Sequence, residues 1–263
     1  MTIMLLLITS CKKSLPTEKA RQRLNKIGIE YTQEAFNNAV INKDKLAIEL
    51  FIDSKYDASY VLKDAIAIYT TEDNKDINLI KKLIQNSSTF NVKYEDSLGY
   101  RYESALEEAV YQENLEIIVF LLKNGADVNS NNGEPIKKAL IRKKNLEIAN
   151  ILIKNGANIN IKDEDGSLLS QISAMALIDK KSLEILKYLL DKGINVNDGE
   201  NGKSEALLLA VTLQDSELVE LLLKKGANVN SIWIEYGERY TLYDAAQNNS
   251  KIISILNKYN KKQ

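Results

Sequence analysis

Apolar residues recur along this chain at helical spacing, and four of these apolar stripes end in the same way. Each stripe reaches a glycine and continues into residues that alternate between polar and apolar; the four segments are 121–129, 152–160, 189–197 and 222–230. Glycine adopts a left-handed backbone conformation at little cost because it has no Cβ, so a glycine behind an apolar stripe predicts the end of a helix. The alternating residues predict a short extended arm.

Polar residues mark the expected beginnings of these helices. Asn and Ser side chains accept hydrogen bonds from the free amide groups of a first helical turn. We therefore predict that the four helices begin at Asn114, Asn145, Ser182 and Ser216. A shorter first helix, marked by alanine and leucine at helical spacing, is expected before each second helix. Four of these first helices are expected over 104–109, 134–139, 205–210 and 241–245. The predicted fold class is thus all-α, built from pairs of helices.

The spacing of the glycines indicates a repeat. The steps between Gly125, Gly156, Gly193 and Gly226 are 31, 37 and 33 residues, and ankyrin repeats have a period of about 33 residues. The short helices also keep the apolar positions of the ankyrin motif Thr-Pro-Leu-His-x-Ala. The chain therefore resembles an ankyrin-repeat protein. The resemblance implies a solenoid of about seven helix-turn-helix repeats with short hairpin turns, the first two and the last being degenerate.

Weaker copies of the pattern lie on both sides of the four strong ones. Lys55 and Ser87 stand at the glycine position of two N-terminal copies, and Thr32 is expected to cap a first helix over 33–41. A truncated last helix is expected over 252–259. The histidine of the motif is missing, because the chain contains no histidine. In the family that histidine ties neighbouring loops together, so these repeats are expected to hold their hairpins by other contacts.

The first residues of the chain have a different character. An apolar run over 3–8 is too short to span a bilayer, and it leads to Cys11, the only cysteine. The sequence Ile-Thr-Ser-Cys at 8–11 resembles the lipobox of bacterial lipoproteins. That resemblance implies a signal peptide over 1–10 and acylation of Cys11. Because no Lys or Arg precedes the apolar run, the alternative is the apolar N-terminus of a cytoplasmic protein.

A lipid at Cys11 would set the domain organisation. Residues 11–30 are then a polar tether, with a helix over 17–26 that Gly28 stops, and residues 31–263 form the ankyrin-repeat domain. One cysteine cannot form a disulfide within the chain, so we expect the stability to come from stacking of the repeats.

The residue after the cysteine bears on the choice of membrane. Some bacteria retain lipoproteins in the inner membrane by an aspartate at this position, and this chain has Lys12 there. We therefore expect a lipid-anchored protein of the bacterial cell envelope, in the outer membrane and facing the periplasm or the surface.

Composition and charge exclude several kinds of function. The net charge is −1 and the basic residues show no concentrated surface, so we expect no nucleic-acid binding. Without histidine the chain cannot build a Ser-His, Cys-His or histidine-zinc site. The sequence Asp-Glu-Asp-Gly at 163–166 fits a hairpin turn better than a calcium loop, because oxygen ligands are missing around it. We predict no enzyme activity, no cofactor and no metal site.

Aromatic residues in two predicted turns suggest where a partner binds. The turns over 94–103 and 233–243 share the pattern Gly-x-Arg-Tyr, and Tyr, Trp and Arg often dominate the energy of protein interfaces. The candidate partner-binding residues are Tyr100, Arg101, Tyr102, Trp233, Tyr236, Arg239 and Tyr240. The alternative is that these aromatic residues pack within the turns and stiffen them.

The predicted function follows from the family that the chain resembles. Ankyrin repeats dock protein partners on the concave wall formed by their first helices and hairpin tips. We therefore predict a monomeric, membrane-anchored protein–protein interaction module whose partner is a protein of unknown identity. Two rival functions are an immunity-type inhibitor of a toxin or enzyme and a protector of a periplasmic enzyme.

Overall fold

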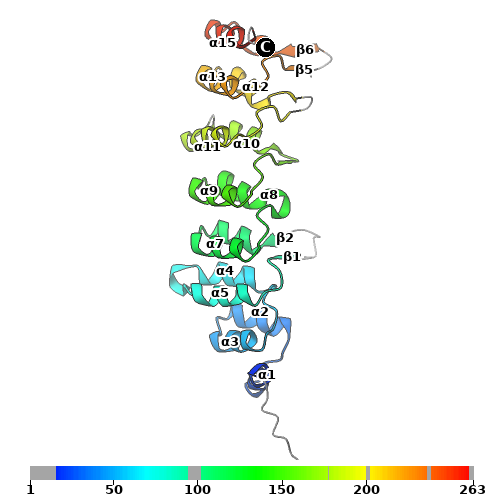
Figure 1. Ribbon diagram of the computed structural model, residues 1–263, viewed down its shortest axis with the longest axis vertical. Coiled ribbons are helices and arrows are strands. Elements are labelled where there is room, and N and C mark those ends of the chain that lie inside the picture. The colour runs from blue at the N-terminus through cyan, green and yellow to red at the C-terminus, as the bar shows by residue number, and fades with distance from the viewer. Residues whose placement is uncertain (1–15, 94–101, 177, 200–201, 236–237, 261–263) are drawn as a thin grey trace, which may run out of the picture. The chain divides into compact units, whose positions relative to one another are not determined.

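The computed structural model describes residues 16–93, 102–176, 178–199, 202–235 and 238–260 (Figure 1). The chain forms two compact units that divide after Asp127, and each unit is built from layers of paired helices. Strands occur in the described residues only as three two-stranded antiparallel hairpins. The predicted all-α architecture of helix pairs is confirmed.

The first unit contains three helix pairs and one additional helix at its start. Its helices are α1 (Pro16–Lys26), α2 (Gln33–Ile41), α3 (Lys45–Asp53), α4 (Leu62–Tyr69), α5 (Ile77–Gln85), α6 (Ala105–Tyr111) and α7 (Leu115–Lys123), with a 3₁₀ turn η1 (Glu72–Asn74) before α5. Strands β1 (Asn91–Lys93) and β2 (Tyr102–Ser104) pair antiparallel between α5 and α6. The first helices α2, α4 and α6 pack against one another in that order.

The second unit continues the same arrangement, and Figure 1 shows its helix pairs stacked one above the next. Its helices are α8 (Ser130–Lys137) with the π-helical segment η2 (Lys138–Arg142), α9 (Leu146–Lys154), α10 (Leu168–Ala176), α11 (Lys180–Asp191), α12 (Glu205–Thr212), α13 (Ser216–Lys224), α14 (Leu242–Ala245) and α15 (Ser250–Asn260). Its strands are β3 (Lys162–Asp163), β4 (Gly166–Ser167), β5 (Ile232–Glu235) and β6 (Glu238–Thr241). The hairpin expected at 163–166 is therefore confirmed.

The predicted helix caps are confirmed where they are asparagines and wrong where they are serines. Asn114 accepts a hydrogen bond from the amide of Ile117, and Asn145 caps α9 in the same way. For α11 and α13 an aspartate before the predicted serine is the cap instead: Asp179, three residues before Ser182, and Asp215, directly before Ser216. A carboxylate is favoured over a hydroxyl there because its negative charge lies at the positive end of the helix.

The glycines end the second helices as predicted. Gly125, Gly156 and Gly226 each have a φ of 91°, and Gly193 has a φ of 81°. A Cβ built on these glycines meets no other atom within 4 Å. The left-handed backbone, and not a lack of space, therefore explains why glycine occupies these positions. Lys55, at the glycine position of a weaker copy, also has a positive φ of 61°.

The core of each repeat lies between its two helices. In α6 and α7, for example, Leu106, Val110, Ile117 and Leu121 are fully buried. Helix α10 departs from this pattern because it places a polar residue in the core. Its Ser173 stands at the position that Val110 occupies in α6. The hydroxyl of Ser173 is fully buried and has no hydrogen-bond partner in the part of the chain that the structure describes. Such a group costs about 1–3 kcal/mol.

Asparagine side chains tie the extended arm of one repeat to the arm of the next. Asn197 donates from Nδ2 to the carbonyl oxygen of Gly226 at 2.9 Å, and its Oδ1 accepts from the amide of Asn228 at 2.8 Å. Asn129 makes the same two contacts with Gly156 and Asn158. These hydrogen bonds between neighbouring loops take the place of the contacts that the histidine of the motif would make.

A lysine supplies a second link of this kind. Lys137 stands at the histidine position of the motif, and its Nζ lies 3.0 Å from Asp163 in the next hairpin and 2.9 Å from Glu134 in its own helix. Burial lowers the pKa of Lys137, but its contacts with Glu134 and Asp163 outweigh burial and raise the pKa overall. The ammonium group therefore remains charged while it joins two repeats.

The ends of the array agree with the predictions except in one segment. Thr32 caps α2 by accepting from the amide of Ala35, and the last helix, α15, covers the predicted 252–259. The helix predicted over 17–26 is confirmed as α1, but it packs on α3 with Leu24 fully buried and so is not part of a free tether. Alanine and leucine four residues apart give α1 an apolar edge, so it joins the folded unit.

We predict that Asn197→Ala lowers the free energy of unfolding by about 1–2 kcal/mol, because two hydrogen bonds between repeats are lost. Asn155→Ala is the matched control, since the Asn155 amide contacts only the carbonyl oxygen of Ile151 in its own helix. Urea unfolding of both variants measures the difference. Equal stability losses in the two variants would contradict a role of the arm contacts in joining repeats.

Candidate protein-binding surface

The β5–β6 hairpin extends beyond the helices at the last repeat of the second unit (Figure 1). Its register pairs Trp233 with Tyr240 and Ile234 with Arg239. Successive side chains of a strand point to opposite faces, so these two pairs lie on opposite faces of the hairpin. Trp233 and Tyr240 are half-buried, whereas Arg239 is exposed and Ile234 is 78% exposed.

The structure thus places three of the predicted binding residues on one hairpin, with Trp233 and Tyr240 on one face and Arg239 on the other. Ile234 is an addition that sequence reasoning missed, although the alternation within the strand already placed it on the opposite face to Trp233. Tyr102 is the first residue of β2, where the register pairs it with Lys93. The remaining predicted residues, Tyr100, Arg101 and Tyr236, lie outside the described residues, and so does the predicted lipidation site Cys11.

Helix α14 holds the base of this hairpin in place. Thr241, the last residue of β6, caps α14 by accepting from the amide of Asp244, and the carboxylate of Asp244 accepts from Thr241 in return. These hydrogen bonds from the side chain and backbone of Thr241 lower the pKa of Asp244. The two faces of the hairpin are therefore presented from a fixed base, which favours selective recognition over adaptable contact.

A second exposed surface lies on the first helices α10 and α12, which pack side by side. Each helix buries one apolar side and carries further apolar residues on its outward side. We use the name α10–α12 patch for the half-exposed or exposed apolar residues of these helices together with Ile178 and Leu213, which follow them; its residues are Ala174, Met175, Ile178, Leu208, Leu209 and Leu213. Ile178 is 87% exposed and Leu213 is 46% exposed. Exposed apolar residues gathered on two neighbouring helices make this surface a candidate protein-binding site.

The preceding first helix carries positive charge on its own outward side. Lys138 is half-buried and Arg142, one helical turn later, is exposed on η2. Sequence reasoning did not single out the α10–α12 patch, because apolar residues of a first helix look alike in the sequence whether they face the core or the solvent. The signal was available, since α12 is apolar around most of its circumference, and one helix cannot bury every side in a repeat of this kind.

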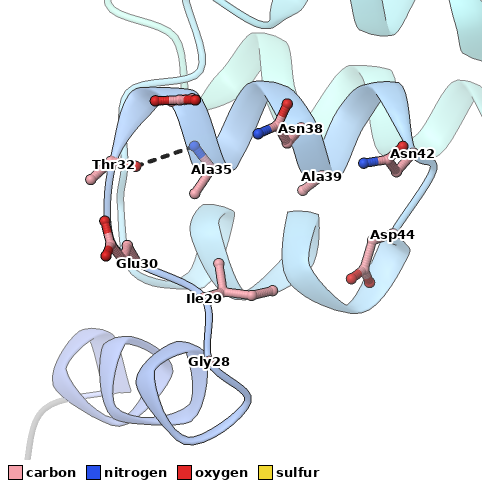
Figure 2. A pocket seen from close by; sticks show the side chains of 10 residues that line it. Gly28, Ile29, Glu30, Thr32, Ala35, Asn38, Ala39, Asn42 and Asp44 are labelled. Carbon is pink, nitrogen blue, oxygen red and sulfur yellow. Dashed lines mark hydrogen bonds between the residues drawn. The ribbon is translucent and has the colours of Figure 1, made fainter.

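The first unit has a pocket of about 500 Å³ beside α2 (Figure 2). It is lined by Gly28, Ile29, Glu30, Thr32, Glu34, Ala35, Asn38, Ala39, Asn42 and Asp44. Figure 2 shows Asn38 and Asn42 along the helix, between Glu30 and Asp44. Thr32 and Asp44 already serve as helix caps by accepting from the amides of Ala35 and Ala47. The pocket is thus the open side of the first repeat, and we assign it no ligand.

Some carboxylates of the second unit make contacts between repeats. Asp179 accepts from Lys144 and from the hydroxyl of Ser182, both at 2.7 Å, and these contacts hold its pKa well below the usual value. Glu220 lies 3.1 Å from Lys258 in the last helix, which lowers the pKa of Glu220. Both acids therefore have structural partners.

No group of three or more Asp, Glu, Cys or His residues in the described ranges is placed to hold a metal ion. Among the helices of those ranges, none has the length and apolar character that a membrane span requires.

Comparison with known families identifies the architecture. The model of the family described as ankyrin repeats matches this chain in three overlapping copies, at residues 65–163, 138–233 and 173–263. This chain belongs to the ankyrin-repeat family. The family consists of interaction scaffolds, so the chain is a protein–protein interaction module.

Solved structures show the same fold. The crystal structure of the ankyrin repeat domain of Bcl-3, described as a unique member of the IkappaB protein family, has a TM-score of 0.61 at 19% identity, over 84% of this chain and 97% of that one. The human ASB11 ankyrin repeat domain has a TM-score of 0.54 at 20% identity, over 85% of this chain and 96% of that one. No curated protein matches this chain.

We predict that Trp233 and Tyr240 are energetically coupled across the hairpin by about 0.5–1 kcal/mol, as cross-strand aromatic pairs are. A double-mutant cycle with Trp233→Ala and Tyr240→Ala, followed by urea unfolding, measures this coupling. The pair on the opposite face, Ile234 and Arg239, is the control and should show almost additive effects because both side chains are exposed. Additive effects at Trp233 and Tyr240 would show that these rings do not stiffen the hairpin.

Proposed function

We propose that this chain is a lipid-anchored module of the bacterial cell envelope that binds another protein through the first helices and hairpin turns of its repeats. The observation that carries the proposal is the exposed apolar surface on first helices of an ankyrin array. A solenoid needs its apolar residues between layers. Apolar residues that face outward from α10 and α12 contribute nothing to that stacking, and a partner would bury them.

The α10–α12 patch favours a partner of particular chemistry. Its residues would accept a segment with apolar side chains, because Leu, Ile and Met offer dispersion contacts and few polar groups. Arg142 on the neighbouring first helix favours carboxylates at one edge of that segment. The partner is therefore proposed to present an apolar stripe with an acidic flank.

The β5–β6 hairpin would extend this surface. Arg239 and Trp233 belong to the residue types that most often dominate interface energy, and the exposed Ile234 adds apolar area. The half-buried Trp233 and Tyr240 also pack across the hairpin, so their part in binding is expected to include positioning of their neighbours.

The proposed module acts by binding and not by catalysis. The carboxylates with perturbed pKa values described above are engaged with lysines or helix caps, which supports structural roles. We propose no cofactor, no metal and no nucleic acid for this chain, and we propose that it is a monomer until it meets its partner.

The proposed anchor rests on the sequence at 8–11, where the apolar residue, two small residues and Cys11 resemble a lipobox. Several acyl chains at about 0.8 kcal/mol per buried methylene hold a protein on a membrane stably. Lys12 in place of an aspartate supports the outer membrane, with the module in the periplasm or at the surface.

We expect Cys11→Ser to abolish labelling by a radioactive or alkyne-bearing fatty acid and to release the protein from the membrane fraction, because no other thiol exists in the chain. The wild-type chain in the same bacterial host is the control. A Cys11→Ser protein that still incorporated fatty acid would remove the anchor from the proposal.

A matched pair of leucines tests the binding surface. Leu213 in the α10–α12 patch is 46% exposed, and Leu46 on the second helix α3 is 50% exposed. Leu213→Ser should weaken binding of a partner purified with the wild-type chain by about tenfold or more, as interface anchors do. Leu46→Ser should leave the affinity unchanged.

Both leucine variants should keep the wild-type melting temperature, since neither side chain is buried. Affinity can be measured by titration calorimetry. Equal affinities of the two variants, with both folded, would exclude the α10–α12 patch as the binding surface.

A further inference from the structure

The first helix is basic although the whole chain is not. Helix α1 contains four basic residues and one acidic residue, Glu18, while the net charge of the chain is −1. The terminal element of a repeat array needs a polar outer face for solubility, but solubility does not require one sign of charge. The excess of positive charge on α1 is therefore a feature to explain.

The basic residues of α1 are divided between two tasks. Arg21 is used internally, because its Cζ lies 4.4 Å above the centre of the Tyr31 ring. Lys19, Arg23 and Lys26 are spaced i, i+4 and i+7, so they line one side of the helix. All three are exposed, and none forms an ion pair with a described residue. We call these three residues the basic stripe.

The basic stripe is open to the outside of the first unit. Helix α1 packs against α3 through Ala20 and Leu24. Figure 1 shows α1 as the end layer of this unit, with the rest of the unit on one side of it only, and Figure 2 shows the same arrangement from close by. No described element covers the stripe.

We propose that the basic stripe binds the anionic headgroups of a membrane surface. The proposal deepens the proposed lipid anchor, because Cys11 precedes Pro16 by five residues. Five residues reach no further than about 18 Å even when fully extended. A lipid at Cys11 would therefore hold α1 within a short distance of the headgroups, where each Lys or Arg is attracted to an anionic surface.

The chemistry of the stripe favours a membrane over a folded protein partner. Its three cations are spread along a helix of low hydropathy, and no apolar side chain of α1 is exposed between them. A diffuse positive surface without an apolar centre lacks the buried anchors of a protein interface. It suits many anionic headgroups, whose positions adjust to the cations. A lipid and a basic patch together also form the two-signal arrangement that stabilises membrane binding.

Vesicle binding tests the proposal without any acyl chain. The full-length chain with Cys11→Ser is mixed with sedimenting vesicles of phosphatidylcholine, alone or with about one third phosphatidylglycerol, at about 0.1 M NaCl, where charges act over roughly 10 Å. We expect binding to the anionic vesicles to be at least about tenfold tighter than to the neutral ones. The preference should disappear at high salt, because screening then reaches only a few ångström.

The decisive comparison uses two triple variants with the same change in net charge. Lys19→Glu, Arg23→Glu and Lys26→Glu together should remove the preference for anionic vesicles. Lys123→Glu, Lys154→Glu and Lys181→Glu, at exposed lysines of α7, α9 and α11, should keep it. Circular dichroism confirms that both variants are folded. Equal loss in both variants, or no preference in the parent chain, would overturn the proposal.

The outcome is separable from that of the proposed anchor. Fatty-acid labelling of Cys11 in cells tests the anchor alone, and the vesicle assay tests α1 alone. If Cys11 is labelled but the two triple variants bind anionic vesicles equally, the proposed lipid anchor stands and the proposed role of the basic stripe is refuted. An unlabelled protein with a clear anionic preference would keep the stripe and refute the lipid.

Discussion

No repeat in this chain can bury its own apolar residues, so every layer depends on the layer beside it. Each helix pair closes one half of a core, and the neighbouring pair supplies the other half. Hydrogen bonds such as those of Asn197 fix the distance between the arms, and ion pairs such as that of Lys144 with Asp179 fix the distance between the helices. The dependence on neighbours explains why polar contacts concentrate between repeats.

The same dependence determines which surfaces remain for recognition. Second helices and the flanks of first helices are used in stacking, whereas the outward sides of first helices and the exposed faces of the β5–β6 hairpin are left free of it. In the second unit these free sides carry the α10–α12 patch and the β5–β6 hairpin. In the first unit the free outer side of α1 is positively charged. Different chemistry on different free sides would allow one array to contact both the proposed partner and the proposed membrane surface.

Sequence reasoning succeeded where one residue type has one physical reason to be present. Gly125 and its equivalents are required by the backbone, and Asn114 by free amides, so both features were predicted. The prediction that Ser182 caps its helix was wrong because Asp179, three residues earlier, is the cap. Capping propensity alone does not rank the two residues. The packing of α1 was missed although Ala20 and Leu24 stand four residues apart, since its many charges dominated the interpretation.

The candidate site was harder to predict than the fold. Pairing of Trp233 with Tyr240 depends on register, which becomes visible only when both strands are placed. The α10–α12 patch depends on which side of α12 faces the core, and Leu208 and Leu209 look the same as buried leucines in the sequence. Tyr100, Arg101 and Tyr236 lie outside the described residues, so their predicted part in binding stays a prediction.

The buried hydroxyl of Ser173 has a consequence for how the second unit responds to a partner. In a linear array, stability is approximately a sum of repeat and nearest-neighbour contributions, and an unsatisfied buried polar group weakens the layer that holds it. That layer is α10, which also carries Met175 and leads to Ile178 in the outward apolar patch. A partner that binds only the closed layer would shift the opening equilibrium toward the closed state. Partner binding would then stabilise the closed α10 layer. Amide hydrogen exchange in α10 would slow as more of the patch becomes occupied.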